Sequence, residues 1–261
     1  MSITVHQHAV VSANAQLADG VVVEPFAVIE DNVVVGSGTH IGTHALVANG
    51  SRIGNNCRIH HGAAVGTVPQ DLKFHGEESI LEIGDHTTVR EFATLNRGTT
   101  ASGKTSIGHH TFIMAYAHVA HDCVVGSHVI LANSVNLAGH VIVEDNVVIG
   151  GLVPIHQFVR IGCHAMVGGG YRVPKDVPPY ILAAHEPLTY QGLNVVGLRR
   201  RNFKQETITA LEQAYQIIYH SHLNTSQAIE KIRAELPPSD EIKHIIEFVE
   251  QSKRGIIWAS R

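Results

Sequence analysis

The residues best suited to chemistry lie in the segment Ala120-His121-Asp122-Cys123 and, eighteen residues after His121, at Gly139. A histidine can take up a proton near neutral pH, and a neighbouring carboxylate such as Asp122 can orient its ring. Gly139 has no side chain, so a substrate can approach its backbone N–H, which could stabilise an oxyanion. The pattern predicts His121 as a general base, and a turn histidine beside a turn glycine is the alternative.

A period of six residues indicates the elements that position these groups. From Val5 to Val173 every sixth residue is aliphatic, except at Asp71, Glu77 and Ala101. This period fits neither an α-helix nor a sheet built of ordinary hairpins. It fits a three-sided prism in which a short strand and a turn make each side and eighteen residues make one coil.

The same spacing stacks three candidate residues. His121, Gly139 and Gln157 are eighteen residues apart, so each is expected one coil above the last on one edge of the prism. Successive coils should be about 4.8 Å apart, the spacing of paired strands.

Two segments cannot continue the prism and are expected to leave it as loops, near 67–79 and 97–104. The first contains Gln70, Asp71 and Lys73, which mix an amide, a carboxylate and an amine. Functional residues concentrate on such excursions from a rigid scaffold, so this loop is a candidate binding segment. A surface loop without a function is the alternative.

The six-residue period stops after Val173. We expect residues 1–177 to form the β-structure and residues 178–261 to form a helical domain. This domain could also serve only to cap the open end of the prism.

Three helices are expected in that domain. Asn202 and Gln205 resemble a capping box before the first helix. Ser239 is expected to cap the third helix, which should end at Gly255.

Composition and charge limit the class of protein. The formal net charge is −4 and charged residues make up 16 %, so no global basic field indicates nucleic-acid binding. Hydrophobic residues reach 44 %, which excludes disorder. No export signal and no apolar stretch of about 20 residues is apparent. The three cysteines form no CxxC pair, which fits a reducing compartment and predicts a cytoplasmic protein.

The repeat resembles that of the hexapeptide-repeat acyltransferases over about residues 3–173. The resemblance implies a mainly β fold, namely a left-handed parallel β-helix followed here by a C-terminal α-helical domain. It also implies a homotrimer with sites between neighbouring prisms.

Within this family the chain is similar to the UDP-N-acetylglucosamine O-acyltransferases. The similar segments are Gln70-Asp71-Leu72-Lys73-Phe74, Ala120-His121-Asp122-Cys123, Leu137-Ala138-Gly139-His140-Val141, Ile155-His156-Gln157-Phe158, Asp176-Val177-Pro178-Pro179-Tyr180 and Gly192-Leu193-Asn194. The resemblance implies transfer of a 3-hydroxyacyl chain from acyl carrier protein to the 3-hydroxyl of UDP-N-acetylglucosamine. This reaction is the first step of lipid A biosynthesis and is expected to need no cofactor and no metal.

The resemblance also implies roles for matching residues. His121 would take the proton of the attacking hydroxyl, Asp122 would orient His121, and the Gly139 N–H would hold the oxyanion. The implied substrate-binding residues are Gln70, Asp71, Lys73, His118, His140, His156, Gln157, Asn194 and Arg200. The last two would meet the uridine diphosphate.

Two further positions bear on substrate choice. In the family a residue near Gly169 closes the acyl groove, and bulk there shortens the accepted chain. The open run Gly168-Gly169-Gly170 therefore implies a long acyl chain. Val196 stands where the family often has an acidic residue, so nucleotide contacts are expected to differ there.

A local basic patch, the segment Arg199-Arg200-Arg201 with Lys204, lies on this acidic chain. It would suit docking of the acidic carrier protein. The alternative is a solvated helix start.

Three other functions remain open at this point. The chain could be a coenzyme A-dependent sugar acetyltransferase or a non-catalytic β-solenoid. Trimeric left-handed β-helices also include zinc carbonic anhydrases, in which His118, His121 and His140 would be the metal ligands.

Overall fold

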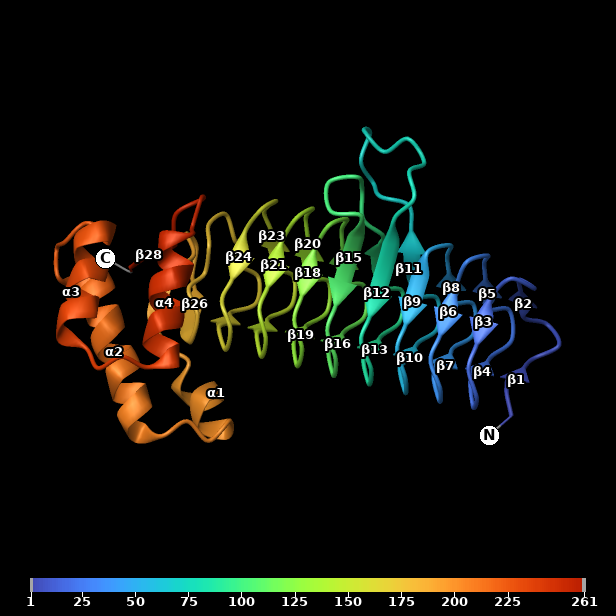
Figure 1. The fold of residues 1–261 in the computed structure, drawn as a ribbon, viewed down its shortest axis with the longest axis horizontal. Helices are drawn as coiled ribbons and strands as arrows, with labels where there is room; N and C mark the ends of the chain where they lie inside the picture. Colours follow the sequence, from blue (N-terminus) through green and yellow to red (C-terminus); the bar gives the residue numbers. More distant parts are fainter. Residues whose placement is uncertain (1, 260–261) are drawn as a thin grey trace.

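The computed structural model describes residues 2–259. An elongated prism of short strands occupies the N-terminal part of the chain, and four helices gather at its C-terminal end (Figure 1). The prism has three sheets, each formed by strands from successive coils.

The strands of the three sheets follow one another in rotation along the chain. Sheet A contains β1 (Thr4–Val5), β4 (Val22–Val23), β7 (His40–Ile41), β10 (Arg58–Ile59), β13 (Thr88–Val89), β16 (Phe112–Ile113), β19 (Ile130–Leu131), β22 (Val148–Ile149), β25 (Met166–Val167), β26 (Ile181–Ala184), β27 (Thr189–Leu193) and β28 (Trp258–Ala259). Sheet B contains β2 (Val10–Val11), β5 (Val28–Ile29), β8 (Leu46–Val47), β11 (Ala64–Thr67), β14 (Thr94–Asn96), β17 (His118–Val119), β20 (Asn136–Leu137) and β23 (Pro154–Ile155). Sheet C contains β3 (Gln16–Leu17), β6 (Val34–Val35), β9 (Ser51–Ile53), β12 (Ile80–Ile83), β15 (Lys104–Ile107), β18 (Val124–Val125), β21 (Ile142–Val143) and β24 (Arg160–Ile161).

The parallel register explains why the six-residue pattern survives two excursions. Thr4 pairs with Val22, a coil of eighteen residues. Arg58 pairs with Thr88, a coil of thirty, and Thr88 pairs with Phe112, a coil of twenty-four. The two longer coils therefore carry twelve and six additional residues. Both numbers are multiples of six, so each aliphatic column resumes in phase.

Those additional residues leave the prism on one side. Residues 68–79 lie between β11 and β12, and residues 97–103 lie between β14 and β15 (Figure 1).

The core is a set of aliphatic columns inside the prism. Ile41, Ile59, Ile113 and Leu131 are fully buried, as members of one such column. Val5, which begins that column, is 44 % exposed because no coil among residues 2–259 lies below it. Each fully buried side chain of this size contributes about 1.5–3 kcal/mol, and the stacking of coils is what provides the burial.

Many of the histidines occupy one position of the turns. His44, His86, His110 and His128 are the second residue of their turns and have φ between 57° and 58°, or 54° for His110. This left-handed conformation favours Asn, Asp and His among residues with side chains. Turn geometry therefore accounts for much of the high histidine content.

The C-terminal part continues sheet A before the helices begin. β26 pairs in parallel with β25, β27 turns back antiparallel to β26, and β28 pairs with β27. The helices are α1 (Val195–Arg200), α2 (Gln205–His220), α3 (Thr225–Glu235) and α4 (Asp240–Glu250).

The expected caps are partly right. Ser239 caps α4 by accepting a hydrogen bond from the Ile242 N–H. The capping box at Asn202 is wrong, because α2 begins after Lys204 and Asn202 follows the end of α1 with φ 61°. The expected end of the third helix is also wrong, since α4 stops at Glu250.

Within residues 2–259, no helix combines the length and the apolar character that crossing a bilayer requires.

Candidate active site

Three neighbouring strands of sheet B position the candidate residues. His118 of β17 pairs with Asn136 of β20, which pairs with Pro154 of β23. The turns after these strands carry His121, Gly139 and Gln157 on one edge. The turns are joined by backbone hydrogen bonds, from the His140 N–H to the His121 carbonyl (3.1 Å) and from the Phe158 N–H to the Gly139 carbonyl (3.2 Å).

His121 and Asp122 form a buried pair. The Nδ1 atom of His121 lies 2.7 Å from Oδ2 of Asp122. The His121 side chain is 10 % exposed and the Asp122 side chain is fully buried. Because an ionised carboxylate can only accept, Nδ1 carries the proton and Nε2 keeps a free lone pair. That tautomer is the one a general base needs.

Hydrogen bonds to hydroxyl groups from residues 97–104 and β15 hold Asp122 in place. Its carboxylate accepts hydrogen bonds from the Thr99 N–H (3.0 Å), the Thr99 hydroxyl (2.7 Å) and the Ser102 hydroxyl. The Asp122 N–H donates to the Thr105 hydroxyl (2.8 Å). Burial alone would raise the pKa of Asp122, but hydrogen bonds from Ser102, His121 and Thr99 outweigh it and lower the pKa to about 2. Asp122 is therefore ionised at neutral pH.

Gly139 lies directly against the imidazole. A Cβ at this position would be 2.7 Å from both Cε1 and Nε2 of His121, closer than carbon and nitrogen can pack. Glycine is thus required if the ring is to keep its place against this turn.

The Gly139 N–H also differs from equivalent amides on another edge. Ser37, Ser127 and Cys163 occupy the same turn position, and their N–H groups donate to side chains of Asn55, Asp145 and Glu144. Within residues 2–259, no protein group accepts a hydrogen bond from the Gly139 N–H. This donor is free for a ligand and adjoins Nε2 of His121.

Two more histidines border the pair. Nδ1 of His118 lies 2.7 Å from the Thr94 hydroxyl, and burial lowers the pKa of His118. His140 lies edge-on to His121 with ring centroids 5.2 Å apart, and stacks on Phe158 at 4.6 Å. The surroundings of His121 therefore offer a neutral imidazole and an aromatic surface.

The loop with Gln70, Asp71 and Lys73 projects from the prism on the side of the second excursion (Figure 1). Gln70 and Lys73 are exposed, and the Asp71 carboxylate accepts a hydrogen bond from the Lys73 N–H (3.0 Å). Within residues 2–259, no hydrogen bond or ion pair joins these three side chains to His121. The loop is anchored by the Asn96 amide, which donates to the Val68 carbonyl (3.0 Å).

The other predicted residues lie further along the prism. His156 is exposed and Gln157 is half-buried above Gly139. Gly169 is exposed on a different edge from His121, where the Gly170 N–H donates to the Gly151 carbonyl (2.8 Å).

Asn194 has a structural role in this chain. It caps α1, accepting a hydrogen bond from the Gly197 N–H (3.1 Å) and donating to the His164 carbonyl (2.9 Å). Arg200 is exposed in the last turn of α1, and Val196 is 63 % exposed.

Two groups of side chains could hold a metal ion. His121, Asp122 and His140 place one ligand atom each within 4.8 Å of one another. His118 is not part of that group, so the three histidines considered as zinc ligands are not brought together in the described chain. Cys123, next to this group, has its pKa raised to about 12 by burial, which disfavours a thiolate.

Glu144, Cys163 and His244 form the second group, where α4 packs on the prism. The sequence does not suggest this group, because His244 joins it only through the packing of a helix 81 residues beyond Cys163. Hydrogen bonds to Cys163 and Glu144 raise the pKa of His244 to about 10.

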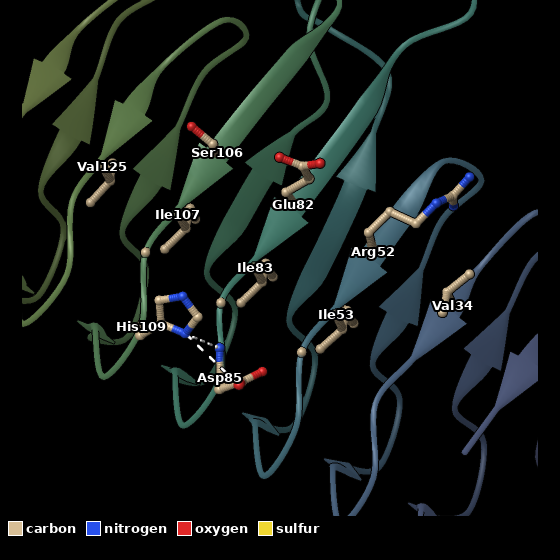
Figure 2. A pocket seen from close by; sticks show the side chains of 13 residues that line it. Val34, Arg52, Ile53, Glu82, Ile83, Asp85, Ser106, Ile107, His109 and Val125 are labelled. Atoms are coloured by element: carbon tan, nitrogen blue, oxygen red, sulfur yellow. Dashed lines mark hydrogen bonds and ion pairs between the residues drawn. The ribbon is translucent and has the colours of Figure 1, made fainter.

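A hollow of about 460 Å³ lies on the face of sheet C, and Figure 2 shows its lining. Arg52 and Glu82 stand along its strands, while Asp85 and His109 meet in its turns. Nδ1 of His109 accepts a hydrogen bond from the Asp85 N–H (3.0 Å), so this nitrogen is occupied in joining two coils. The hollow lacks a free base and a free backbone donor of the kind found beside His121.

Sequence reasoning missed the groups that hold Asp122. Thr99 and Ser102 belong to a segment that leaves the prism, and the six-residue period gives no information about where such a segment returns. The one signal in the sequence is the cluster of hydroxyl-bearing residues around the break in the period at Ala101.

Comparisons with known proteins agree with this architecture. Residues 104–139 match the family model described as bacterial transferase hexapeptide (six repeats), and residues 176–257 match UDP-N-acetylglucosamine O-acyltransferase, domain 2. Residues 104–139 therefore carry the hexapeptide repeat of these transferases, and the predicted left-handed parallel β-helix with a C-terminal helical region is confirmed.

Relatives narrow the assignment. An acyl-[acyl-carrier-protein]–UDP-N-acetylglucosamine O-acyltransferase of Paracidovorax citrulli is 52 % identical over 258 residues, covering 97 % of this chain and 98 % of the relative. One from Thiobacillus denitrificans is 44 % identical over 97 % of this chain and 99 % of its own length. The crystal structure of a UDP-N-acetylglucosamine acyltransferase, LpxA, from Bacteroides fragilis superposes with a TM-score of 0.96 at 46 % identity, covering 97 % of this chain and all of that one. The chain belongs to the acyl-[acyl-carrier-protein]–UDP-N-acetylglucosamine O-acyltransferase family, and the resemblance drawn from its sequence is confirmed.

Proposed function

We propose that this enzyme transfers a 3-hydroxyacyl chain from acyl carrier protein to the 3-hydroxyl of UDP-N-acetylglucosamine, the first step of lipid A biosynthesis. Membership of the O-acyltransferase family supports the reaction and both substrates. One observation carries the mechanism: the free Nε2 of a carboxylate-oriented histidine adjoins a backbone N–H that no described protein group uses.

In the proposed mechanism, Nε2 of His121 takes the proton of the sugar hydroxyl as that oxygen attacks the thioester carbonyl carbon. The carbonyl oxygen becomes an oxyanion that accepts a hydrogen bond from the Gly139 N–H. The intermediate then expels the carrier thiolate, which recovers the proton from His121. Asp122 stabilises the imidazolium between the two steps, as its ionised carboxylate is positioned to do.

The substrate would be bound by residues around this centre. His118, His140 and Gln157 border His121 and Gly139 and would contact the sugar and the thioester. His156, which is exposed beside Gln157, would also contact the substrate.

The outer part of the proposed site would consist of the residues that contact the uridine diphosphate and of the projecting loop. Arg200 is an exposed cation suited to phosphate, whereas Asn194 would meet the nucleotide only with atoms left free by its capping role. Gln70, Asp71 and Lys73 would reach substrate from a loop whose polar side chains face solvent.

We further propose that the active form is a homotrimer in the cytoplasm. Phe26, Phe92, Tyr116 and Leu152 are each 44 % or more exposed and lie at equivalent turn positions along one edge, which would suit packing against another prism. All three cysteines are free, as a reducing compartment would keep them. Sedimentation at equilibrium would test the trimer, and a monomer at assay concentration would contradict it.

The decisive experiment is mass spectrometry of the product formed from UDP-N-acetylglucosamine and a mixture of 3-hydroxyacyl carrier proteins. One ester-linked hydroxyacyl chain on the sugar nucleotide is expected, and intact thioesters would contradict the proposed reaction. The same spectrum gives the preferred chain length. We expect a long chain, and a shorter one after Gly169→Met, whose side chain would project from an exposed turn once its Cβ is accommodated 3.1 Å from the Gly151 carbonyl oxygen.

A further inference from the structure

A second cluster lies between the prism and the helical region, away from the proposed active site. Glu144 follows β21, Cys163 follows β24 one coil above, and His244 projects from α4. Their candidate ligand atoms all lie within 4.8 Å of one another. Figure 1 shows α4 running beside the last coils of the prism.

We propose that Glu144, Cys163 and His244 form a zinc site that fastens α4 to the β-helix. The set combines a carboxylate, a thiol and an imidazole, which are the three ligand types that Zn²⁺ takes in proteins. In tetrahedral zinc sites the metal–ligand distances are about 2.0–2.3 Å. The three candidate ligand atoms, all within 4.8 Å of one another, are close enough for one ion to be shared.

The contacts around the cluster already hold two of the three ligands. The Oε2 atom of Glu144 accepts a hydrogen bond from the Cys163 N–H (2.9 Å). The same oxygen lies 2.6 Å from Nε2 of His244. The Glu144 side chain is 19 % exposed and that of His244 is 33 % exposed. Zinc binding would replace the hydrogen bond between Nε2 of His244 and Oε2 of Glu144, and it would release protons because the metal takes a neutral imidazole and a thiolate.

Neighbouring groups fix the cluster without filling it. Arg160 lies 3.5 Å from Oε1 of Glu144 and its guanidinium stacks 4.5 Å over the ring of Phe248. Arg160 therefore engages the carboxylate oxygen that faces away from His244. Tyr180 packs edge-on to the His244 ring with centroids 6.4 Å apart.

Metal binding to metal-free protein tests this site, because its readout does not depend on acyl transfer. After dialysis against a chelator, we expect the full chain to bind one Zn²⁺ and to show a higher melting temperature with zinc. Co²⁺ in the same site should give a thiolate-to-metal charge-transfer band. The group formed by His121, Asp122 and His140 contains no thiol, so the band distinguishes the two.

The variants are Cys163→Ser and His244→Asn, with Cys57→Ser as a matched control for a cysteine outside the cluster. We expect Cys163→Ser to abolish the band. Each cluster variant should weaken zinc binding by more than about tenfold, the lower limit for loss of even an outer partner of a metal ligand. Cys57→Ser should bind zinc as the parent does. Lack of stoichiometric zinc on the parent protein, a cobalt band that survives Cys163→Ser, or unchanged affinity in His244→Asn would each overturn the proposal.

Discussion

Nδ1 of His121 lies 2.7 Å from Oδ2 of Asp122, the next residue of the same turn. Adjacent residues can meet in this way because Asp122 has a left-handed conformation, with φ 59°. Aspartate tolerates that region better than most residues. The second excursion then holds the carboxylate through Thr99 and Ser102, so a segment that leaves the prism orients a residue that belongs to it.

Replacing the proposed base should separate activity from folding. A general base contributes about 10²–10⁴-fold, so His121→Ala should lower kcat by that factor. Steady-state kinetics measures this, with circular dichroism to verify the fold. His128→Asn is the matched control, since His128 is an exposed turn residue on another edge with φ 58°. A kcat within a few-fold of the parent would remove His121 from the mechanism.

Gly139→Ala should disable the site by displacing the histidine. Its Cβ would lie 2.7 Å from Nε2 of His121, so the ring must move, and a shift of about 1 Å can cost about 100-fold in rate. The comparison is Gly151→Ala, the same turn position on another edge, where the nearest atom would be 3.2 Å away. Equal activity of the two variants would show that the close approach at Gly139 is not needed.

The Asp122 carboxylate should make the fold sensitive to acid. Its pKa falls from 3.8 to about 2 on folding, so the ionised form stabilises the folded protein above pH 3.8. This contribution, about 2 kcal/mol by linkage, is lost as pH falls from about 4 towards 2. Urea unfolding of the parent and of Asp122→Asn should therefore show a stability difference at pH 6 that narrows at pH 3. A constant difference would contradict this origin.

Exposed arginines at the end of α1 should make carrier binding sensitive to salt. Arg199 and Arg200 are exposed in its last turn and Arg201 follows it. Salt shortens the Debye length from about 30 Å at 0.01 M to about 3 Å at 1 M, so the KM for the acidic carrier should rise with salt. Arg200→Ala should flatten this dependence, whereas Arg233→Ala on α3 should not. A KM that is independent of salt would argue against this docking surface.

The fold was largely predictable because one period controls it. Each aliphatic residue at intervals of six points inward, and the excursions are multiples of six, so the pattern stays in phase from Val5 to Val173. Beyond the prism the chain obeys no such rule. The hairpin of β26 and β27 and the short helix α1 were not predicted, and the cap expected at Asn202 was wrong because α1 occupies the preceding residues.

The column of His121, Gly139 and Gln157 could be predicted because coil spacing converts a sequence interval into a position in space. Thr99 and Ser102 could not, since contacts made by an excursion depend on its own conformation. The position of His244 beside Glu144 depends in turn on how α4 packs, which no local pattern specifies.

Because the coils stack regularly, positions along one edge of the prism repeat at a fixed spacing. Two groups on one edge are separated by whole numbers of coils, each about 4.8 Å, so backbone changes can lengthen or shorten that separation only in this fixed step. A step requires eighteen residues at once, and inserting a single residue within a strand would turn the following aliphatic side chains out of the core. Smaller changes in the distance between two groups must therefore come from the size of single side chains in the turns, where a substitution leaves the coil spacing unchanged.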